Sequence, residues 1–205
     1  MKREIFLASN NEGKVERYRR LLGATDLDIV LRTPKDFGLE HIEVEENGKT
    51  LAENALIKAR AYFGQVPLAI LANDTGFWVE GEGLVVAPKR ITLNGRDEHE
   101  LSKKEIAQSM VEFWKGIATK HGGRVEAAWL EAFALLDPDG TVHTTDAKRE
   151  VILTDQVFGE PHIEMPVRAL YISKVTNKKA VEHSEEEERR EMKPVIDALS
   201  KILTS

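Results

Sequence analysis

The sequence predicts an α/β fold in which helices pack around a mixed β-sheet. Two observations favour this fold: helical and strand patterns alternate through the first half of the chain, and two strands joined by a tight-turn signal occur in the second half. The 205 residues are enough for one compact domain or for two lobes that share a sheet. We therefore expect one domain, made of two lobes, over residues 1–205.

In the first half, short apolar runs mark the strands, and capping or breaking residues mark the helices. Gly23 ends the first helix, and the spacing of Thr50 and Glu53 is that of a capping box, which starts the second. Pro34 and Gly38 bound a turn. The predicted elements are a strand at 3–8, a helix at 14–22, a strand at 27–31, a helix at 50–64, a strand at 68–73 and an extended segment at 77–80.

In the second half, the pattern changes from a long helix to a hairpin. Apolar residues recur with helical spacing between Ser102 and Lys120, on a stripe formed by Ile106, Met110, Phe113 and Ile117. The run 137–140, Asp-Pro-Asp-Gly, is a strong turn signal between two strands. The predicted elements are a helix at 102–120, strands at 127–136, 151–154 and 167–172, and a helix at 184–203.

The composition is that of an ordinary soluble globular protein, with 41% hydrophobic and 31% charged residues. No apolar stretch approaches the ~20 residues of a membrane helix. The apolar run 5–8 is shorter than the roughly 7–15 residues of a signal-peptide core, so we expect a cytoplasmic protein. A net charge of −6 argues against a general nucleic-acid binder but allows a nucleotide ligand. The absence of cysteine excludes disulfides and thiol chemistry.

Polar groups follow two of the predicted strands. Asp74 and Thr75 come directly after the apolar run 68–72, at the end of a strand where open α/β sheets bind ligands. The loop that contains Ser9 and Asn11 precedes a helix, so it can offer backbone N–H groups and a helix N-terminus to an anion. The alternative for this second segment is a capped helix with an exposed lysine.

Three motifs resemble the inosine triphosphate pyrophosphatase family in order and spacing. They are the segments 8–14, 45–59 and 73–76, and the resemblance extends from residue 1 to about residue 83. It implies a twisted mixed sheet flanked by helices in two lobes, with an active-site cleft between the lobes. It also implies a nucleoside triphosphate substrate, Mg²⁺ as cofactor and a homodimer.

The resemblance also assigns roles to residues in these motifs. Asn11 and Lys14 contact the triphosphate, Glu46 binds the metal with Glu45 as the alternative ligand, and Asp74 is both metal ligand and proton acceptor. Magnesium prefers such hard oxygen ligands and keeps several waters. The substrate-binding candidates are Ser9, Asn11, Lys14, Asn54, Lys58, Thr75, Arg168 and Lys193; the catalytic candidate is Asp74, and the metal ligands are Glu46 and Asp74.

Residues of the helix at 50–64 support the same chemistry. Asn54 and Lys58 are four residues apart and share a helix face, so they can direct an amide and an ammonium at one anion. Glu53 either completes the capping box or belongs to the surroundings of the metal. Trp78 either stacks on a base or, as is commoner for an aromatic residue in an apolar strand, belongs to the core. The six histidines have no paired spacing for zinc, and we expect them on the surface or in loops.

The sequence departs from the family in two regions. Asn73 replaces the first Asp of an Asp-Asp-Ser-Gly motif, which removes a charge and favours a hydrogen-bonding role, while Thr75 keeps the hydroxyl. The family stretches that grip the base, Phe-Gly-Tyr-Asp-Pro and Ser-His-Arg, fall on residues 165–169 and 191–193, where Arg168 and Lys193 stand instead. We therefore expect little preference for inosine or xanthosine triphosphate over standard purine nucleotides.

The leading hypothesis is a magnesium-dependent nucleoside triphosphate pyrophosphatase that splits the α–β phosphoanhydride into a monophosphate and pyrophosphate. Two alternatives remain. One is a nucleotide-binding homologue with little catalysis, which Asn73 and the altered base motifs favour. The other is hydrolysis of a different phosphorylated metabolite in the same phosphate cradle.

Overall fold

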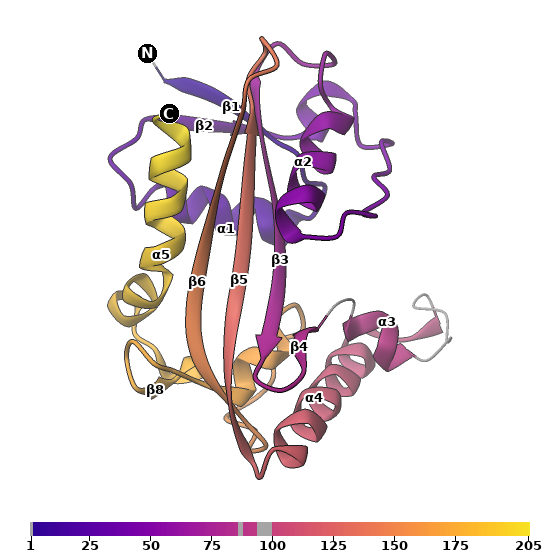
Figure 1. Cartoon of the computed structure of the whole chain (residues 1–205), viewed down its shortest axis with the longest axis vertical. Helices are drawn as coiled ribbons and strands as arrows, with labels where there is room; N and C mark the ends of the chain where they lie inside the picture. Colours follow the sequence, from indigo (N-terminus) through magenta and orange to yellow (C-terminus); the bar gives the residue numbers. More distant parts are fainter. Residues whose placement is uncertain (1, 86–87, 94–99) are drawn as a thin grey trace. The chain divides into compact units, whose positions relative to one another are not determined.

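The computed structural model, drawn in Figure 1, describes residues 2–85, 88–93 and 100–205. The described strands form one sheet in the order β2-β1-β3-β5-β6-β7-β8, and β4 pairs with β3. β1 runs parallel to both β2 and β3, whereas β4 is antiparallel to β3, and β7 is antiparallel to β6 and to β8. The predicted mixed sheet is therefore confirmed. The strands are β1 (Arg3–Leu7), β2 (Ile29–Arg32), β3 (Ala69–Val79), β4 (Gly83–Val85), β5 (Arg124–Leu136), β6 (Val142–Thr154), β7 (Tyr171–Ser173) and β8 (Lys178–Lys179).

The long helices lie close to their predicted positions because local caps set their ends. Thr50 and Ser102 accept hydrogen bonds from backbone N–H groups in the first turns of α2 and α4, and Gly23 follows α1. The short helix α3 was not predicted. The helices are α1 (Glu12–Leu22), α2 (Leu51–Ala61), α3 (Pro88–Leu93), α4 (Lys103–Lys120) and α5 (Glu185–Leu203), with 3₁₀ helices at Pro34–Phe37, Pro166–Leu170 and Ala180–Glu182.

The chain divides into two compact units. Unit 1 contains residues 1–75, 130–148 and 193–205, and unit 2 contains residues 76–129 and 149–192. The core of unit 1 includes Phe6, Tyr62 and Ile70, where α2 lies beside β1 and β3. The core of unit 2 is built around Trp114 and Tyr171. No helix in the described part of the chain is long and apolar enough to cross a membrane.

The prediction that a strand ends at residue 73 is wrong, because β3 continues to Val79. β1 pairs with β3 only from Ile5, opposite Ala69, to Leu7, opposite Leu71. Beyond that point β3 continues beside β5 and, near its end, pairs with β4. Asp74 therefore lies inside a strand, three residues past the last residue that pairs with β1. The candidate site residues therefore lie at the carboxyl end of β1 and beside the middle of β3, not at the carboxyl end of β3.

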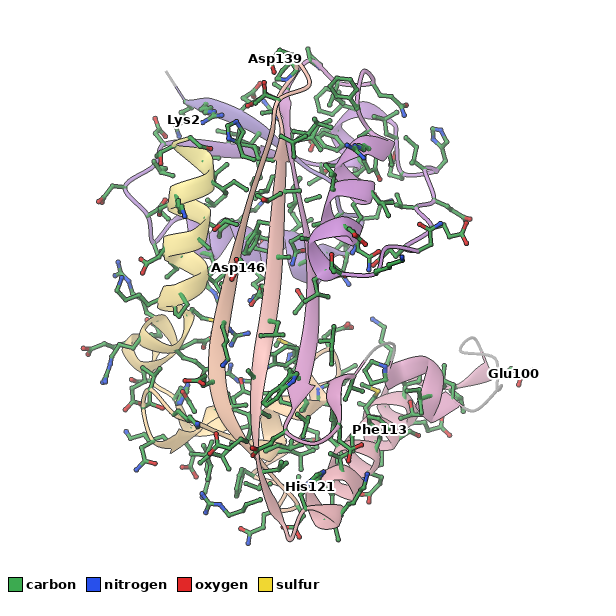
Figure 2. The ribbon with its side chains drawn as sticks, viewed as in Figure 1. Lys2, Glu100, Phe113, His121, Asp139 and Asp146 are labelled. Carbon is green, nitrogen blue, oxygen red and sulfur yellow. The ribbon has the colours of Figure 1, made fainter. Side chains whose placement is uncertain are left out.

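Two strand predictions in the second half were also wrong. β6 starts at Val142, directly after the 137–140 turn that Figure 2 marks at Asp139, and not at residue 151. Polar residues occupy most of its first part, which therefore lacks the apolar run that marked the other strands. The segment predicted as a strand at 167–172 is a 3₁₀ helix followed by β7, since a short buried apolar run does not distinguish the two and Pro166 suits a first helical turn.

The buried face of α4 differs by one position from the predicted stripe. The fully buried residues are Ala107, Val111, Trp114 and Ala118. The four residues of the predicted stripe are only partly buried. One of them, Phe113, still packs edge-on against Trp114 with 5.0 Å between ring centroids.

Candidate functional site

The loop after β1 is fixed by its own side chains. Asn11 caps α1 because its Oδ1 accepts a hydrogen bond from the Lys14 amide at 2.9 Å. The Ser9 hydroxyl accepts from the Asn11 amide at 3.3 Å, and the Ala8 amide donates to the Leu71 carbonyl at 2.9 Å. The loop is therefore held against β3, and the N-terminus of α1 follows it directly. A helix N-terminus favours anions.

A second loop is held against the start of α2. The Gly48 amide donates to Asn54 Oδ1 at 2.8 Å, and the Lys49 amide donates to Glu53 Oε2 at 2.6 Å. A Cβ atom on Gly48 would lie 2.6 Å from Asn54 Oδ1, so only glycine fits this approach. Of the two hypotheses for Glu53, the contacts favour the local one, since its carboxylate holds the backbone ahead of α2.

The centre of the site is an ammonium between two carboxylates. Lys58 Nζ lies 2.8 Å from Glu46 Oε2 and 2.8 Å from Asp74 Oδ1, and it donates to the Asn73 carbonyl at 3.3 Å. Asn54 Nδ2 donates to the other oxygen of Asp74 at 3.2 Å. The side chains of Asp74 and Lys58 are each 12% exposed, against 43% for Glu46. Burial on this scale strengthens the interaction between the charges.

These groups border a pocket of about 280 Å³ that lies wholly in unit 1. Its polar wall comes from the loop after β1, from Lys14 and from the Lys58 cluster. Its apolar wall comes from Ile42 and Val44, and Tyr62 also lines it. Burial lowers the pKa of the Lys14 ammonium below its ordinary value, and the nearby Lys58 charge lowers it further. The pocket is lined by Ala8, Ser9, Asn10, Asn11, Lys14, Ile42, Val44, Glu46, Lys58, Tyr62 and Asn73.

Most of the predicted site residues meet at this pocket. Ser9, Asn11, Lys14, Glu46 and Lys58 line it, and Asn54 and Asp74 contact the cluster from behind. It is Glu46, and not Glu45, that contacts Lys58. The buried Asn73 donates to the Thr75 hydroxyl at 2.9 Å, as expected for a hydrogen-bonding role at this position. Thr75 itself does not line the pocket.

The two candidates from the replaced base motifs are engaged elsewhere. Arg168, in unit 2, donates to the Ala180 carbonyl at 2.9 Å and lies 3.5 Å from a carboxylate oxygen of Glu188. Lys193, whose side chain is 70% exposed, pairs with Asp197 one turn along α5 at 2.7 Å. The structure therefore does not bring Lys193 to the pocket, although both belong to unit 1.

The oxygen donors fit a hard divalent cation bound together with substrate. Glu46 and Asp74 both approach the Lys58 ammonium, so two carboxylates converge on one residue of the pocket wall. Within the described residues, no group of three or more His, Cys, Asp and Glu side chains is placed to hold a metal. Two carboxylates suit magnesium, which completes its shell with waters and phosphate oxygens.

Sequence reasoning missed Tyr62 and did not foresee that one loop histidine is buried. Tyr62 follows Lys58 by four residues on α2, a spacing that could have identified it as a pocket residue. His183 lies in a loop, one of the two expected placements, but its side chain is fully buried, with Nδ1 3.3 Å from Glu191 Oε2 and a 2.7 Å hydrogen bond between Nε2 and the Thr176 hydroxyl. Trp78 is only partly buried, between the buried Phe77 and Val79.

Comparison with known proteins places these features in a family. The model of the Ham1 family matches residues 5–160. A protein of Frankia alni named dITP/XTP pyrophosphatase is 33% identical over 152 residues, which are 74% of this chain and 73% of that protein. A protein of the same name from Corynebacterium diphtheriae is 29% identical over 147 residues, covering 72% and 68% of the two chains.

Solved structures share the fold. The HAM1 protein of Coxiella burnetii superposes with a TM-score of 0.73 at 24% identity, covering 98% of each chain. The nucleoside-triphosphatase (dITP/XTP pyrophosphatase) of Mycobacterium abscessus superposes with a TM-score of 0.70 at 22% identity, covering 98% of this chain and 100% of the other. Because the family model covers most of the sequence and the fold agrees, this chain belongs to the Ham1 family.

Proposed function

We propose that this chain is a nucleoside triphosphate pyrophosphatase, which hydrolyses the α–β phosphoanhydride to a nucleoside monophosphate and pyrophosphate. The observation that carries the proposal is the convergence of Glu46, Lys58 and Asp74 beside the N-terminus of α1. The relatives named dITP/XTP pyrophosphatase support the same activity. The site thus combines acceptors for a cation with donors for phosphate, as phosphoryl transfer requires.

In the proposed reaction, unit 1 supplies the groups that act on the triphosphate. The α1 N-terminus and the Lys14 ammonium bind phosphate oxygens, and Lys58 offsets the charge that develops on the leaving pyrophosphate. Asp74 accepts a proton from the attacking water as the water oxygen bonds to the α-phosphorus and the bond to the bridging oxygen of the β-phosphate breaks. Asn54 holds the second oxygen of Asp74, which keeps the first oxygen directed at Lys58, beside the pocket.

Glu46 and Asp74 would hold the metal, for which we propose Mg²⁺. When bound, the ion would neutralise phosphate charge and make a coordinated water more acidic. Lys58 keeps the two carboxylates together in the structure, and it can turn to the phosphates when a cation takes over the carboxylate charge. The homodimer, the cytoplasmic location and the absence of nucleic-acid binding remain predictions from the sequence.

The test is release of pyrophosphate against orthophosphate from a panel of nucleotides that includes dITP, XTP, ATP and GTP, with and without Mg²⁺. We expect pyrophosphate as the product, and a loss on the order of 10²-fold or more in kcat for Asp74→Asn. Asp146→Asn is the matched control, because Asp146 is an exposed carboxylate on β6 (Figure 2). Orthophosphate as the only product, or full activity in Asp74→Asn, would contradict the proposed mechanism.

A further inference from the structure

One pocket residue has no part in the chemistry described above. Tyr62 is the C-cap residue of α2, one turn beyond Lys58 and about 6 Å along the helix axis. Its ring packs on Phe6 with 5.0 Å between centroids, and the residue is only 2% exposed. Tyr62 nevertheless lines the same pocket as Lys14 and Lys58. It therefore belongs both to the core of unit 1 and to the wall of the site.

The Tyr62 hydroxyl lacks a partner among the residues that the structure describes. The other well-buried tyrosines differ in this respect, since the hydroxyls of Tyr18 and Tyr171 contact Glu131 and Glu191. Burial raises the pKa of Tyr62, so its hydroxyl stays a neutral donor. The hydroxyl is not among the fully buried polar atoms of the described residues that lack a partner, so it keeps a small accessible surface, and the residue lines the pocket. Phenylalanine would fill the same space but would offer no donor there. A tyrosine at this place makes sense where a ligand completes the hydrogen bond.

The direction of α2 indicates which part of a ligand Tyr62 meets. Asn54 and Lys58 contact Asp74, whereas Tyr62 packs on Phe6, which pairs with Ile70. Ile70 precedes Asp74 by four residues, about 13 Å along β3. Tyr62 thus lies toward the end of the pocket remote from the carboxylates, with Ile42 and Val44 also in the wall. A phosphate chain that reacts beside Asp74 and passes Lys14 and Lys58 has its far end there.

We propose that Tyr62 is a substrate-binding residue whose hydroxyl donates a hydrogen bond to the terminal phosphate of the triphosphate, and to the same phosphate in the pyrophosphate product. This inference rests on the proposed function, because it takes the scissile bond to lie beside Asp74. It makes Tyr62 a determinant of phosphate-chain length. The apolar wall next to it offers no donors to a further phosphate.

The experiment compares Tyr62→Phe with Tyr18→Phe, which removes a buried hydroxyl of unit 1 outside the pocket. Calorimetry in Mg²⁺ measures binding of inorganic pyrophosphate and of inosine monophosphate, and thermal unfolding is measured without ligand. For Tyr62→Phe we expect about tenfold weaker pyrophosphate binding, unchanged monophosphate binding and an unfolding temperature no lower than that of the parent protein. For Tyr18→Phe we expect a lower unfolding temperature with both affinities unchanged.

Several outcomes would overturn the inference: unchanged pyrophosphate affinity in Tyr62→Phe, equal loss for both ligands, or no pyrophosphate binding by the parent protein. Equal loss would show that Tyr62 meets the nucleoside side of the ligand. The proposed function is tested separately by product analysis. A parent protein that releases no pyrophosphate from any nucleotide, yet binds it through Tyr62, would refute the activity while leaving the role of Tyr62 intact.

Discussion

Gly48→Ala tests whether the loop before α2 positions the site. The new methyl group would lie 2.6 Å from Asn54 Oδ1, 2.8 Å from Glu53 Cβ and 3.0 Å from the Asn54 amide nitrogen. Glu53 Cβ and the Asn54 amide nitrogen are fixed by the backbone of α2, so the loop must move instead. Overpacking of this kind costs about 1–3 kcal/mol of the free energy of unfolding. For a chain of this length, that is a fall of about 2–12 °C in Tm.

The effect on activity should exceed the effect on stability. Moving the loop breaks the 2.8 Å hydrogen bond from Gly48 to Asn54, and Asn54 is the residue that holds Asp74. It also displaces Glu46, two residues earlier. We expect kcat to fall on the order of 10-fold or more at a temperature where the variant is fully folded, since small misplacements of reacting groups are costly. Pyrophosphate release and thermal unfolding are measured on the same preparations.

Gly116→Ala is the matched control, because a Cβ atom there meets nothing within 4 Å and the residue lies inside α4. The helix should gain up to about 1 kcal/mol from this change, with activity unaltered. If Gly48→Ala unfolds and hydrolyses nucleotide like the parent protein, the loop does not hold the site as described.

Four further predictions follow from the same contacts. Lys14→Ala and Lys58→Ala should weaken binding of a nucleoside triphosphate far more than binding of the monophosphate in calorimetric titrations, and equal weakening would place both lysines outside the triphosphate site. Burial and the Lys58 charge lower the pKa of Lys14 below its ordinary value of 10.5, so the folded protein loses this proton at lower pH than the unfolded chain does. The free energy of unfolding should therefore rise with pH between the two pKa values. Urea titrations of Lys14→Met should lack that rise. Glu191→Gln breaks a buried ion pair with Arg149 and should lower the free energy of unfolding by about 3–5 kcal/mol, whereas Asp197→Asn, in an exposed pair, should change it by less than about 0.5 kcal/mol. In kcat/KM, we expect less than about 100-fold preference for inosine triphosphate over ATP, equivalent to about 2.7 kcal/mol, and a larger ratio would reveal base-reading groups not yet identified.

The long helices were predictable because their signals are local. Thr50, Ser102 and Gly23 mark helix ends through contacts within one or two turns of the same segment. The strands depended on partners far away in the sequence. Nothing near residue 73 reveals that β3 continues beside β5, and the polar first half of β6 is a strand because its neighbours in the sheet make it one.

The site was predictable where one segment carries both chemistry and spacing, as with Asn54 and Lys58 on one helix face. The ion pairs between segments were not. Arg17 on α1 lies 2.6 Å from the buried Glu131 on β5, and Arg149 lies 2.9 Å from the buried Glu191 on α5. A charged residue in a sequence is most often on the surface, and only the fold determines which charges are buried together.

The phosphate-binding residues are better supported than the base-binding candidates. The region matched by the Ham1 family model, residues 5–160, contains every candidate of the phosphate and metal site but neither Arg168 nor Lys193. Arg168 already donates to the Ala180 carbonyl, and Lys193 pairs with Asp197, so both side chains have partners other than a purine base. Strong discrimination between purines needs buried groups that are left unpaired when the wrong base binds. Lys14, Lys58 and Asp74 lie together, whereas Arg168 and Lys193 are engaged elsewhere. We therefore expect this chain to recognise the triphosphate and to discriminate only weakly between purine bases.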